Sequence, residues 1–491
     1  MYDAITQFLA NNAPVEQAEA CGVYPRSCHT LNGKPVFMVR QSAADALVAP
    51  ADSGFTGQPV ADGSFVVCPL SHENAVTLRQ LFPFTAPSPV LGKHRTFGVG
   101  DRLGLATEGH IRVFEHYDAY PVFAQQSIRE LTLTNRSFND VLDCVSFAVF
   151  RDNFTRPFGA DGDHLKTFDE VRMAIACGYT MITLDCSEHI RNDVQDMTDE
   201  QVAAAYEPDA ALEEKYLGKT FRVGEMEITY DKAMFMRICL IYNKAIEFAA
   251  SVYRTFFTGQ TPLDFEVSID ETVTPTTPAQ HFYVANELFA RGARPATIAP
   301  RFCGEFQKGI DYMGDLAQFE KEFAEHAAIA DHFSYKISVH SGSDKFSVFR
   351  IVGKYTHGRF HVKTAGTSWL EAMVIIAEHC PALYREVHQF ALETGFQAAR
   401  KYYHVTTDLT KIPALDTLTD AQLPQLFEQD DARQLIHITY GVILSCKNED
   451  GSFRFRDRLY EVWRTYAAEY AARLEKHIGR HLQMLYEGFE A

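Results

Sequence analysis

A short polar stretch, FGADGDHLKT from Phe158 to Thr167, combines residue types that perform acid–base and metal chemistry. It holds two aspartates, a histidine and a lysine just ahead of an apolar segment, FDEVRMAIACG. A carboxylate can take and return a proton, and an imidazole can bind a divalent cation. If His164 binds such a cation, Asp163 beside it would lie within reach of the substrate oxygens that the cation polarises.

Further polar side chains recur at every second position of runs that are otherwise apolar. In DFEVSID, residues 264–270, Glu266 and Asp270 share one face because side chains alternate along a strand. The same alternation in YKISVH, residues 335–340, places His340 on a polar face. A strand buried on both faces should be nearly all apolar. Such polar side chains must therefore be hydrogen-bonded, bound to a ligand or used in chemistry.

Two histidines and one carboxylate, His164, His340 and Glu266, are ligand types that Zn, Mn or Fe accepts. The ligands would come from separate strands rather than from one local motif. For each single residue the alternative is an internal hydrogen-bonded network. We expect a divalent metal cation here because all three residues fall near the carboxyl ends of their strands.

Cationic and hydroxyl side chains near the same strand ends are candidates for holding an anionic substrate. They are Lys166, Arg301, Ser341 and Lys345, because ammonium, guanidinium and hydroxyl groups donate to an anion. The alternative for SGSDKF, residues 341–346, is an ordinary helix N-cap. A phosphate-binding glycine loop is not indicated, since GVGDRLG lacks both the GxGxxG pattern and a Lys-Ser/Thr ending.

Eight β-then-α units, starting at about residue 95, would position these side chains. Each unit has a β-rich run that ends in glycine or polar residues, and a helical segment follows. Such a series predicts a (β/α)8 barrel of the TIM type, with a long insertion between 190 and 261. The runs are TFGVGDRLG at 96, PVFAQQ at 121, PFGADGDH at 157, YTMITLDC at 179, PLDFEVSID at 262, PATIAPRF at 295, YKISVHSG at 335 and RFHVKTAG at 359.

Polar residues at the ends of these runs favour the barrel over a doubly wound open sheet, which is the alternative fold. In a barrel, all eight carboxyl ends surround one mouth, where active sites lie. The first and third runs are the least regular strands, because glycine is depleted in strand interiors. The residues at the strand ends are Asp101, Gln126, Asp163, Asp185, Asp270, Arg301, His340 and Lys363.

The chain is predicted to have three parts: a small α/β appendage over 1–94, the catalytic barrel over 95–400, and a helical C-terminal extension over 401–491. The appendage alternates two short strands, KPVFMVRQ and SFVVCPL, with a helix, HENAVTLRQLF. The last segment, FRDRLYEVWRTYAAEYAARLEKHIGRHLQMLY, has apolar residues at helical spacing. We expect it to pack on the barrel or on a neighbouring subunit of a homo-oligomer.

The composition is typical of a soluble, cytoplasmic protein. The chain has 491 residues of which 46% are hydrophobic, enough for a sizeable core. No apolar run approaches the roughly 18 residues that span a bilayer, and the start, MYDAITQFLANN, has no signal-peptide pattern. A net charge of -18 without a basic block argues against nucleic acid. We therefore expect a small-molecule partner rather than nucleic acid or a membrane.

Six segments together resemble the tagaturonate epimerase family of bacterial hexuronate catabolism. The resemblance extends from about residue 95 to 370. It implies an isomerase that interconverts D-tagaturonate and D-fructuronate, and therefore an anionic sugar acid as partner. The segments are GVGDRLGLATEGHI, AQQSIRE, FGADGDHLKT, FEVSIDET, APRFCGEFQKGIDY and KISVHSGSDKF.

The resemblance also implies roles for particular residues. It makes Asp163 a proton acceptor, Glu266 a second acid/base, and His164 and His340 metal ligands. Gln307 in CGEFQKG is implied as a further ligand. Glu266 is the alternative for that place, because a neutral amide is an unusual ligand for a transition metal. The Asp-His pair in GDHLKT also resembles that of class II aldolases, in which the aspartate is the acid/base and the histidine binds the metal.

The implied reaction constrains the mechanism. The two sugar acids differ at the carbon β to the ketone, whose C–H bond the carbonyl does not acidify. Retro-aldol cleavage with re-addition on the opposite face would invert that carbon, and transient oxidation by bound NAD is the alternative. No Rossmann fingerprint is present, which favours the metal route. An aldolase acting on a keto-sugar acid and a non-catalytic sugar-binding barrel are the competing functions, which product analysis and a metal assay would separate.

Overall fold

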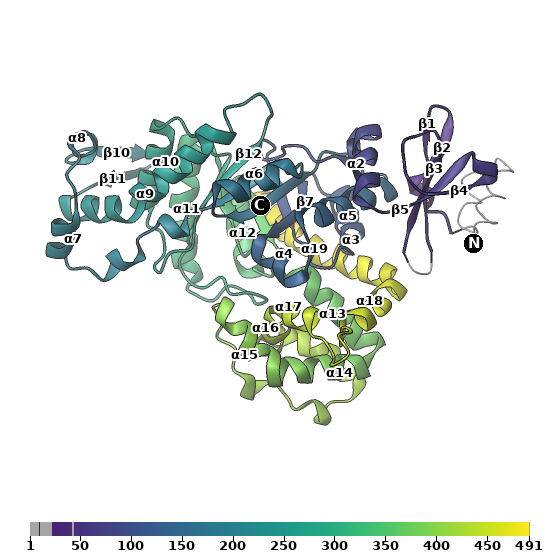
Figure 1. Cartoon of the computed structure of the whole chain (residues 1–491). Coiled ribbons are helices and arrows are strands. Elements are labelled where there is room, and N and C mark those ends of the chain that lie inside the picture. The colour runs from purple at the N-terminus through teal and green to yellow at the C-terminus, as the bar shows by residue number, and fades with distance from the viewer. Residues whose placement is uncertain (1–8, 10–21, 42–43, 491) are drawn as a thin grey trace.

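The computed structural model describes residues 9, 22–41 and 44–490. Figure 1 shows a central barrel with an antiparallel sheet on one side, small helices and a hairpin on the other side, and a layer of helices below. Residues 1–8 and 10–21, which belong to the predicted appendage and contain the start of the chain, lie outside the described residues.

Eight parallel strands close into a barrel, which confirms the predicted fold class. Neighbouring strands follow one another in chain order, and the ring closes where Val362 of the last strand pairs with Phe97 of the first. Each strand overlaps one of the eight predicted runs. The strands are β6 (Thr96–Val99), β7 (Tyr120–Ser127), β8 (Gly159–Leu165), β9 (Met181–Asp185), β12 (Asp264–Ile269), β13 (Thr297–Pro300), β14 (Lys336–Val339) and β15 (His361–Thr364).

Close packing explains the glycines in the first and third strands. A Cβ atom on Gly98 of β6 would collide with the side chain of Gln125 on β7. That side chain donates from Nε2 to the carbonyl of Thr364, so it has a fixed position. On β8, a Cβ atom on Gly162 would press on Leu165. Both runs are therefore strands in which glycine allows a neighbour to approach.

Helices surround the barrel, and many of them begin at side-chain caps. Ser127 with Glu130 and Ser137 with Asp140 form capping boxes, which satisfy backbone N–H groups at the helix starts. The helices before the C-terminal region are α3 (Thr107–His116), α4 (Ile128–Thr134), α5 (Phe138–Arg151), α6 (Phe168–Ala176), α9 (Lys232–Phe256), α10 (Pro278–Ala290), α11 (Leu316–Phe333) and α12 (Phe346–Tyr355).

The last helix, α19 (Ala467–Glu490), packs on both α3 and α12. Gly109 of α3 lies directly against Leu474, and Gly353 of α12 lies against the backbone of Leu485. A side chain at either glycine would separate the helices. Helix α19 thus takes the place of the eighth barrel helix, although about 100 residues separate it from the eighth strand.

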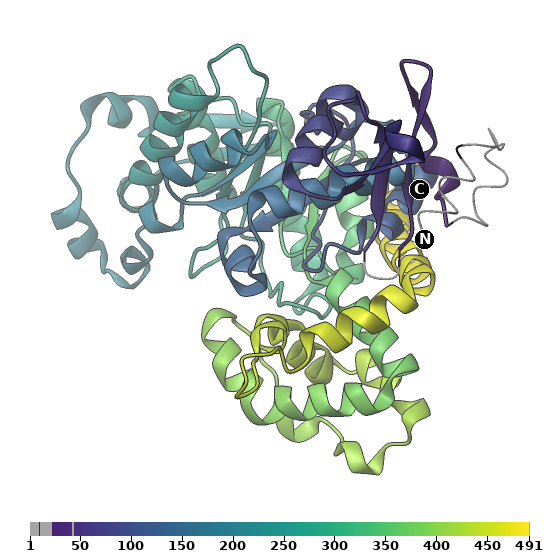
Figure 2. The same cartoon turned by 45° about the vertical axis from the view of Figure 1, so that its right-hand side comes forward.

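Those intervening residues form a layer of helices that lies below the barrel in Figure 2. The layer has its own core, where the rings of Trp369 and Trp463 lie 5.9 Å apart. We propose that 367–466 is one inserted unit, which places a boundary near 366 instead of the predicted 400. Its helices are α13 (Thr367–His379), α14 (Pro381–Phe390), α15 (Phe396–Ala399), α16 (Asp430–Ile438), α17 (Tyr440–Ser445) and α18 (Arg456–Thr465).

Two further regions lie away from the barrel mouth. Between β9 and α9 the chain forms α7 (Asp199–Ala205), α8 (Ala210–Tyr216) and a hairpin of β10 (Thr220–Val223) with β11 (Met226–Thr229). The N-terminal region forms an antiparallel sheet in the order β1-β2-β3-β5-β4, and the helix α2 (His72–Leu81) packs on α5. Its strands are β1 (His29–Leu31), β2 (Lys34–Val39), β3 (Ala46–Pro50), β4 (Gln58–Val60) and β5 (Phe65–Pro69).

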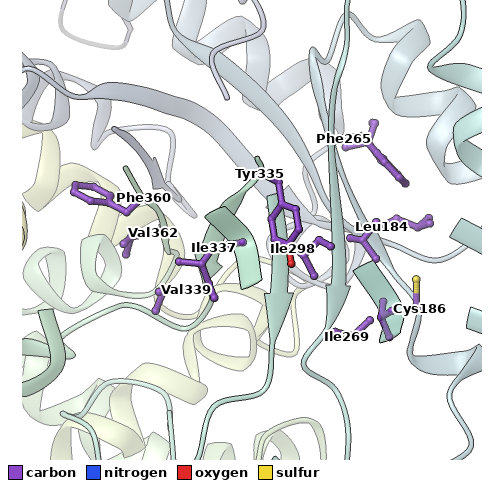
Figure 3. Packing of buried hydrophobic residues seen from close by; sticks show 14 of the residues in the cluster. Leu184, Cys186, Phe265, Ile269, Ile298, Tyr335, Ile337, Val339, Phe360 and Val362 are labelled. Atoms are coloured by element: carbon purple, nitrogen blue, oxygen red, sulfur yellow. The ribbon is translucent and has the colours of Figure 1, made fainter. Parts of the chain in front are cut away.

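Alternation along the barrel strands separates the apolar core from the polar interior. Figure 3 shows Ile298, Ile337 and Val362 in the apolar cluster that joins the strands to the surrounding helices. At alternate positions of the same barrel, Glu266 and Lys363 are buried and hydrogen-bonded to each other. The helices thus anchor the outer face and leave the inner face free to carry a site. In the described part of the chain, no helix is long and apolar enough to cross a membrane.

Candidate active site

A cavity of about 1080 Å³ opens at the carboxyl ends of the barrel strands. Tyr402, Tyr403 and His404 of the helical layer contribute to its wall. Glu266 and Lys345, two of the predicted site residues, are buried outside this lining. The predicted residues in the lining are Asp163, His164, Lys166, Arg301, Gln307, His340 and Ser341.

Lys363 of β15 lies at the centre of a group of carboxylates. Its Nζ donates to Asp163 Oδ1 at 2.5 Å and to Asp161 Oδ2 at 2.6 Å. It also donates to the hydroxyl of Thr183 at 2.6 Å and to Glu266 Oε1 at 3.2 Å. Burial opposes the charge of the ammonium, but the carboxylates outweigh burial and raise the pKa of Lys363 well above its usual value. This one cation therefore fixes both the positions and the charges of its three carboxylate partners.

Asp163 and Glu266 are ionised because of this contact. Burial would raise the pKa of Asp163, but Lys363 and His164 outweigh burial and lower it to about 2. Burial is likewise outweighed at Glu266, where Lys363 and His340 hold the pKa well below its usual value. The opposite holds for Asp161, because burial outweighs Lys363 and raises its pKa to about 6. At neutral pH, Asp163 is a base that reaches the cavity.

His340, which follows β14, lies between two carboxylates. Its Nε2 is 2.7 Å from Glu266 Oε1, and its Nδ1 is 3.2 Å from Asp270 Oδ2. Burial would lower the pKa of His340, but Asp270 and Glu266 outweigh burial and raise it to about 10. Ser268 in turn donates to Asp270, so that the position of this carboxylate is fixed as well.

His164 reaches the cavity because the backbone turns sharply at this residue. Its φ angle is 55°, in the left-handed region that residues other than glycine seldom adopt. The pairing of β8 with β9 shifts between Gly162 and Leu165 at the same place. Such irregularities near active sites redirect a side chain. The imidazole of His164 consequently lies beside that of His340, with ring centroids 5.1 Å apart.

The surroundings of His164 fit a divalent cation, whereas His340 could join it only if the cation replaced the proton between Nε2 and Glu266. His164 Nδ1 is buried without a hydrogen-bond partner among the described residues, and the nearest carboxylate, Asp185 Oδ2, lies 3.7 Å away. The potential ligand atoms of His164, Asp185 and Glu271 lie within 4.8 Å of one another. On His340 the carboxylate at Nδ1 is Asp270. A carboxylate that orients one ring nitrogen while the other nitrogen binds the metal is a recurring arrangement in metal sites.

Gln307, the third ligand that the resemblance implied, is turned towards the helical layer. Its Oε1 accepts hydrogen bonds from Thr406 N, Thr406 Oγ1 and Gln434 Nε2, each at 3.0 Å. Its Nε2 is buried without a partner among the described residues. The amide oxygen is thus engaged, whereas Asp185 and Glu271 offer carboxylate oxygens beside His164.

The predicted substrate-binding residues differ in whether their side chains have hydrogen-bond donors left for a substrate. Lys345 is buried and donates to three backbone carbonyls, at Gln307, Ile310 and Ser343, so its ammonium is fully engaged. Ser341 lines the cavity and accepts a hydrogen bond from Lys308 at 3.0 Å. These contacts leave no donor of the Lys345 ammonium free for a substrate, whereas Ser341 lies at the cavity surface.

Lys166 and Arg301 line the cavity, but both already have partners in the protein. Lys166 lies 3.6 Å from Asp185 and 3.7 Å from Glu188. Arg301 donates to the carbonyl of Thr272 and lies 3.7 Å from Glu305.

Sequence reasoning did not assign Lys363 or Asp161 to the site. The alternation of polar residues in RFHVKT places Lys363 towards the barrel interior, and that pattern was the signal for it. It could not reveal which carboxylates Lys363 contacts, because they lie on other strands. Arg102, Arg129 and Lys308 also line the cavity, and they lie in three of the segments that carry the family resemblance, GVGDRLGLATEGHI, AQQSIRE and APRFCGEFQKGIDY.

A second group of metal-ligand residues lies between the barrel and the helical layer. It consists of Asp344, His477 and His481. Asp344 Oδ1 is 2.5 Å from His477 Nε2, and Asp344 Oδ2 accepts a hydrogen bond from Arg433 at 2.9 Å. His481 Nε2 accepts from the backbone N–H of Asp344, and its Nδ1 lies 2.8 Å from the carbonyl of His477. His477 Nδ1 lies 3.3 Å from Glu371. Every ring nitrogen of this group is therefore engaged.

A family model, a relative and two solved structures are all similar to this chain over nearly its whole length. A family model described as tagaturonate epimerase matches residues 24–485. A tagaturonate/fructuronate epimerase of Thermotoga maritima is 40% identical over 473 residues, which cover 94% of this chain and 96% of the relative. The native crystal structure of a fructuronate-tagaturonate epimerase from Cohnella laeviribosi is 47% identical, with a TM-score of 0.93 over 98% of this chain and 99% of that chain. A glycerol complex of the same enzyme is 48% identical, with a TM-score of 0.93 over 96% of this chain and 98% of that chain.

Proposed function

This chain belongs to the tagaturonate epimerase family, and from this membership we propose that it interconverts D-tagaturonate and D-fructuronate by retro-aldol cleavage and re-addition, with Asp163 and Glu266 as the two acid/base groups. One observation carries the proposal. Both carboxylates contact the same Lys363 ammonium, at 2.5 and 3.2 Å, so one cation links Asp163 in the cavity lining to Glu266, which is buried behind it.

The first half of the reaction opens the sugar chain. Asp163 removes the proton of the hydroxyl on the carbon β to the ketone. The bond between the α and β carbons then breaks, the β carbon becomes an aldehyde, and the electron pair passes to the α carbon as an enolate. A divalent cation such as Zn, Mn or Fe, bound by His164 and His340, would polarise the ketone and stabilise this negative charge.

The second half closes the chain with the opposite configuration. The aldehyde turns about its bond to the rest of its fragment, and the enolate attacks its other face. The proton on Asp163 passes through the Lys363 ammonium, which contacts both carboxylates, to Glu266 and from there to the new alkoxide, so that both carboxylates end ionised. The reverse direction uses the same two groups with exchanged roles. Nε2 of His340, 2.7 Å from Glu266, can hold either a proton or a cation.

The walls of the cavity keep the two fragments together. Residues of the barrel connections and Tyr402, Tyr403 and His404 of the helical layer enclose the space. Reaction within such a space favours recombination because the fragments remain at a high effective concentration. An aldolase would instead release them, so the products distinguish the two activities.

Incubation of the purified protein with tagaturonate tests the proposal. We expect fructuronate to form, without free fragments, and a carbon-13 kinetic isotope effect on the bond between the α and β carbons. Free fragments as the main product would indicate an aldolase. Conversion without an isotope effect on that bond, together with a bound nicotinamide cofactor, would indicate transient oxidation.

A further inference from the structure

The cations in the cavity wall fall into two groups with different partners. Six Lys and Arg residues line the cavity. Lys363 contacts carboxylates, Lys166 lies 3.6 Å from Asp185, and Arg301 lies 3.7 Å from Glu305. Each of these three cations therefore has a carboxylate partner of its own. The other three cations are Arg102, Arg129 and Lys308.

Arg102, Arg129 and Lys308 lie close together, although they follow different strands. Arg102 lies over the ring of Tyr440 and Arg129 over the ring of Tyr403, and the hydroxyls of these two tyrosines are 3.3 Å apart. Arg129 also donates to the carbonyl of Tyr402 at 3.4 Å. Burial lowers the pKa of Lys308, and the charges of Arg129 and Arg102 act in the same direction. Glu130 is the carboxylate in this group, and it pairs with Arg102 at 2.8 Å. Neither Lys308 nor Arg129 forms an ion pair with any described residue. Three cations thus share one anion.

Arg102 has an unused donor in this group. Its side chain is buried, with 3% of the residue exposed, and lies over the ring of Tyr440 at 3.8 Å. Nε and NH2 both contact Glu130, whereas NH1 is buried without a hydrogen-bond partner among the described residues. A buried charged donor without an acceptor is costly. An anion in the cavity would supply that acceptor and balance the excess of positive charge.

We propose that Arg102, Arg129 and Lys308 form the subsite that binds the carboxylate of the sugar acid. This assignment rests on the proposed function and extends it, because it replaces Lys345, whose ammonium is engaged by three carbonyls. Lys308 also donates to Ser341, which gives that predicted residue a place at the edge of the subsite.

The subsite adjoins the reacting groups. Asp163 lines the same cavity as the three cations, and it is paired in register with Ser127, whose hydroxyl accepts from the backbone N–H of Glu130, the partner of Arg102. A carboxylate held by the three cations would place the remaining carbons of the sugar acid towards Asp163 and Lys363. The carboxylate-rich side of the cavity would repel the same group. Charge therefore sets the direction in which the substrate enters.

Binding measurements on a turnover-blocked protein test the subsite. In an Asp163→Asn background, we expect Lys308→Met to weaken the binding of D-fructuronate by about 10- to 100-fold, the range of a charge-assisted hydrogen bond. Arg129→Met should act in the same direction. D-fructose, which lacks the carboxylate, should bind to the background protein and to the variants with affinities that differ by less than about threefold. Lys354→Met is the control, since it removes one cation that is exposed and pairs with Glu320 outside the cavity, and it should not change the preference for fructuronate.

Arg102 needs a paired change because its loss alone would leave Glu130 buried without a partner. The variant Arg102→Gln with Glu130→Gln removes both charges while it keeps two hydrogen-bonding side chains. It should weaken fructuronate binding, with folding checked by circular dichroism. Unchanged fructuronate affinity in both Lys308→Met and Arg129→Met would overturn the subsite. Failure of the wild type to interconvert the two sugar acids would instead overturn the proposed function.

Discussion

The two histidine–carboxylate clusters of this protein consist of the same residue types but differ in what their atoms already do. In the first, His164 lies beside Asp185 and Glu271, its Nδ1 has no hydrogen-bond partner among the described residues, and the cavity adjoins it. In the second, Asp344 and His477 are 2.5 Å apart and the ring nitrogens are engaged. Only the first cluster has an unused ligand atom next to open space.

This difference shows that residue types alone do not define a metal site. A cation must replace whatever its ligands already bind, and in the Asp344 cluster it would have to displace Arg433 and the backbone contacts of His481. Its strongest contacts join the connection after β14 to α16 and α19. We infer that the Asp344 cluster stabilises the fold and that the His164 cluster supports the reaction.

Removal of a histidine should have the largest effect and should show which of the two clusters binds metal. His164→Ala or His340→Ala should lose bound metal and reduce turnover by about 1000-fold or more, because the cation supplies several kcal/mol of charge stabilisation. The control variant His477→Ala should keep its metal. Metal content by mass spectrometry and turnover of tagaturonate are the measurements. Metal loss from His477→Ala, with metal retained in His164→Ala, would reverse the assignment.

Neutralising Asp344 should destabilise the protein. Asp344→Asn leaves Arg433 and His477 without their common anion, and removal of one partner from a buried charge pair costs about 3 kcal/mol or more. Urea denaturation would measure the change in the free energy of unfolding. Turnover below the unfolding range should stay within about tenfold of wild type, because no atom of Asp344 lines the cavity. An Asp344→Asn protein as stable as wild type contradicts the structural role.

Neutralising Asp163 should have the opposite consequence. Asp163→Asn should reduce turnover by about 100-fold, the usual contribution of a positioned acid/base, and keep its metal. The fold should remain stable because Lys363 keeps Asp161 and Glu266 as partners. Asp163 would then be the buried aspartate that acts in the reaction, and Asp344 the buried aspartate that stabilises the fold. A near-normal rate in Asp163→Asn would leave Asp163 only an orienting role.

The smallest expected effect is a pH dependence of stability. Burial would lower the pKa of His477, but the carboxylates of Asp344 and Glu371 outweigh burial and raise it. The protonated form of His477 therefore stabilises the fold. This contribution, on the order of 1 kcal/mol for one hydrogen bond, is complete below the pKa of an unfolded histidine, about 6.5. It is lost as the pH rises through the raised pKa of the folded state.

His481 provides a control of opposite sign. Burial and the neighbouring His477 lower the pKa of His481 to about 3, so its neutral form fits the fold. Its contribution is present above about pH 6.5 and decreases as the pH falls. Unfolding curves of His477→Gln and His481→Gln against wild type, from pH 5 to 9, should therefore change in opposite directions. Parallel changes would show that the two histidines do not titrate as described.

The sequence was sufficient to predict the barrel, because the evidence for it is local. Each strand carries its own β-rich run, and polar residues at alternate positions indicate which face is inside. The inward positions of Glu266 and His340 were predicted in this way, and the two side chains are in contact. Asp163 and His164 stand together in one motif, which is why both were proposed for the site. These predictions needed no knowledge of distant contacts.

The remaining features depend on contacts between distant parts of the chain. Lys363 contacts residues of β8, β9 and β12, and its hydrogen-bond partners cannot be read from spacing. Lys345 carries a charge, which predicts an anion partner, yet backbone carbonyls engage it. Arg102 and Lys308 lie about 200 residues apart in the chain and line the same cavity only after the barrel closes.

The position of α19 also determines when the barrel can be completed during synthesis. Helix α3 follows the first barrel strand, but its neighbour α19 is synthesised about 360 residues later, after the eighth strand and the helical layer. Contacts across such a separation form slowly, because a long loop must close first. Until then, the apolar surfaces of α3 and α12 that α19 covers remain open to water and to other chains. A chain ending at 466 should therefore be more sensitive to protease and more prone to aggregate than the full chain. Helix α3, the first helix of the barrel, is covered only once α19 has been synthesised.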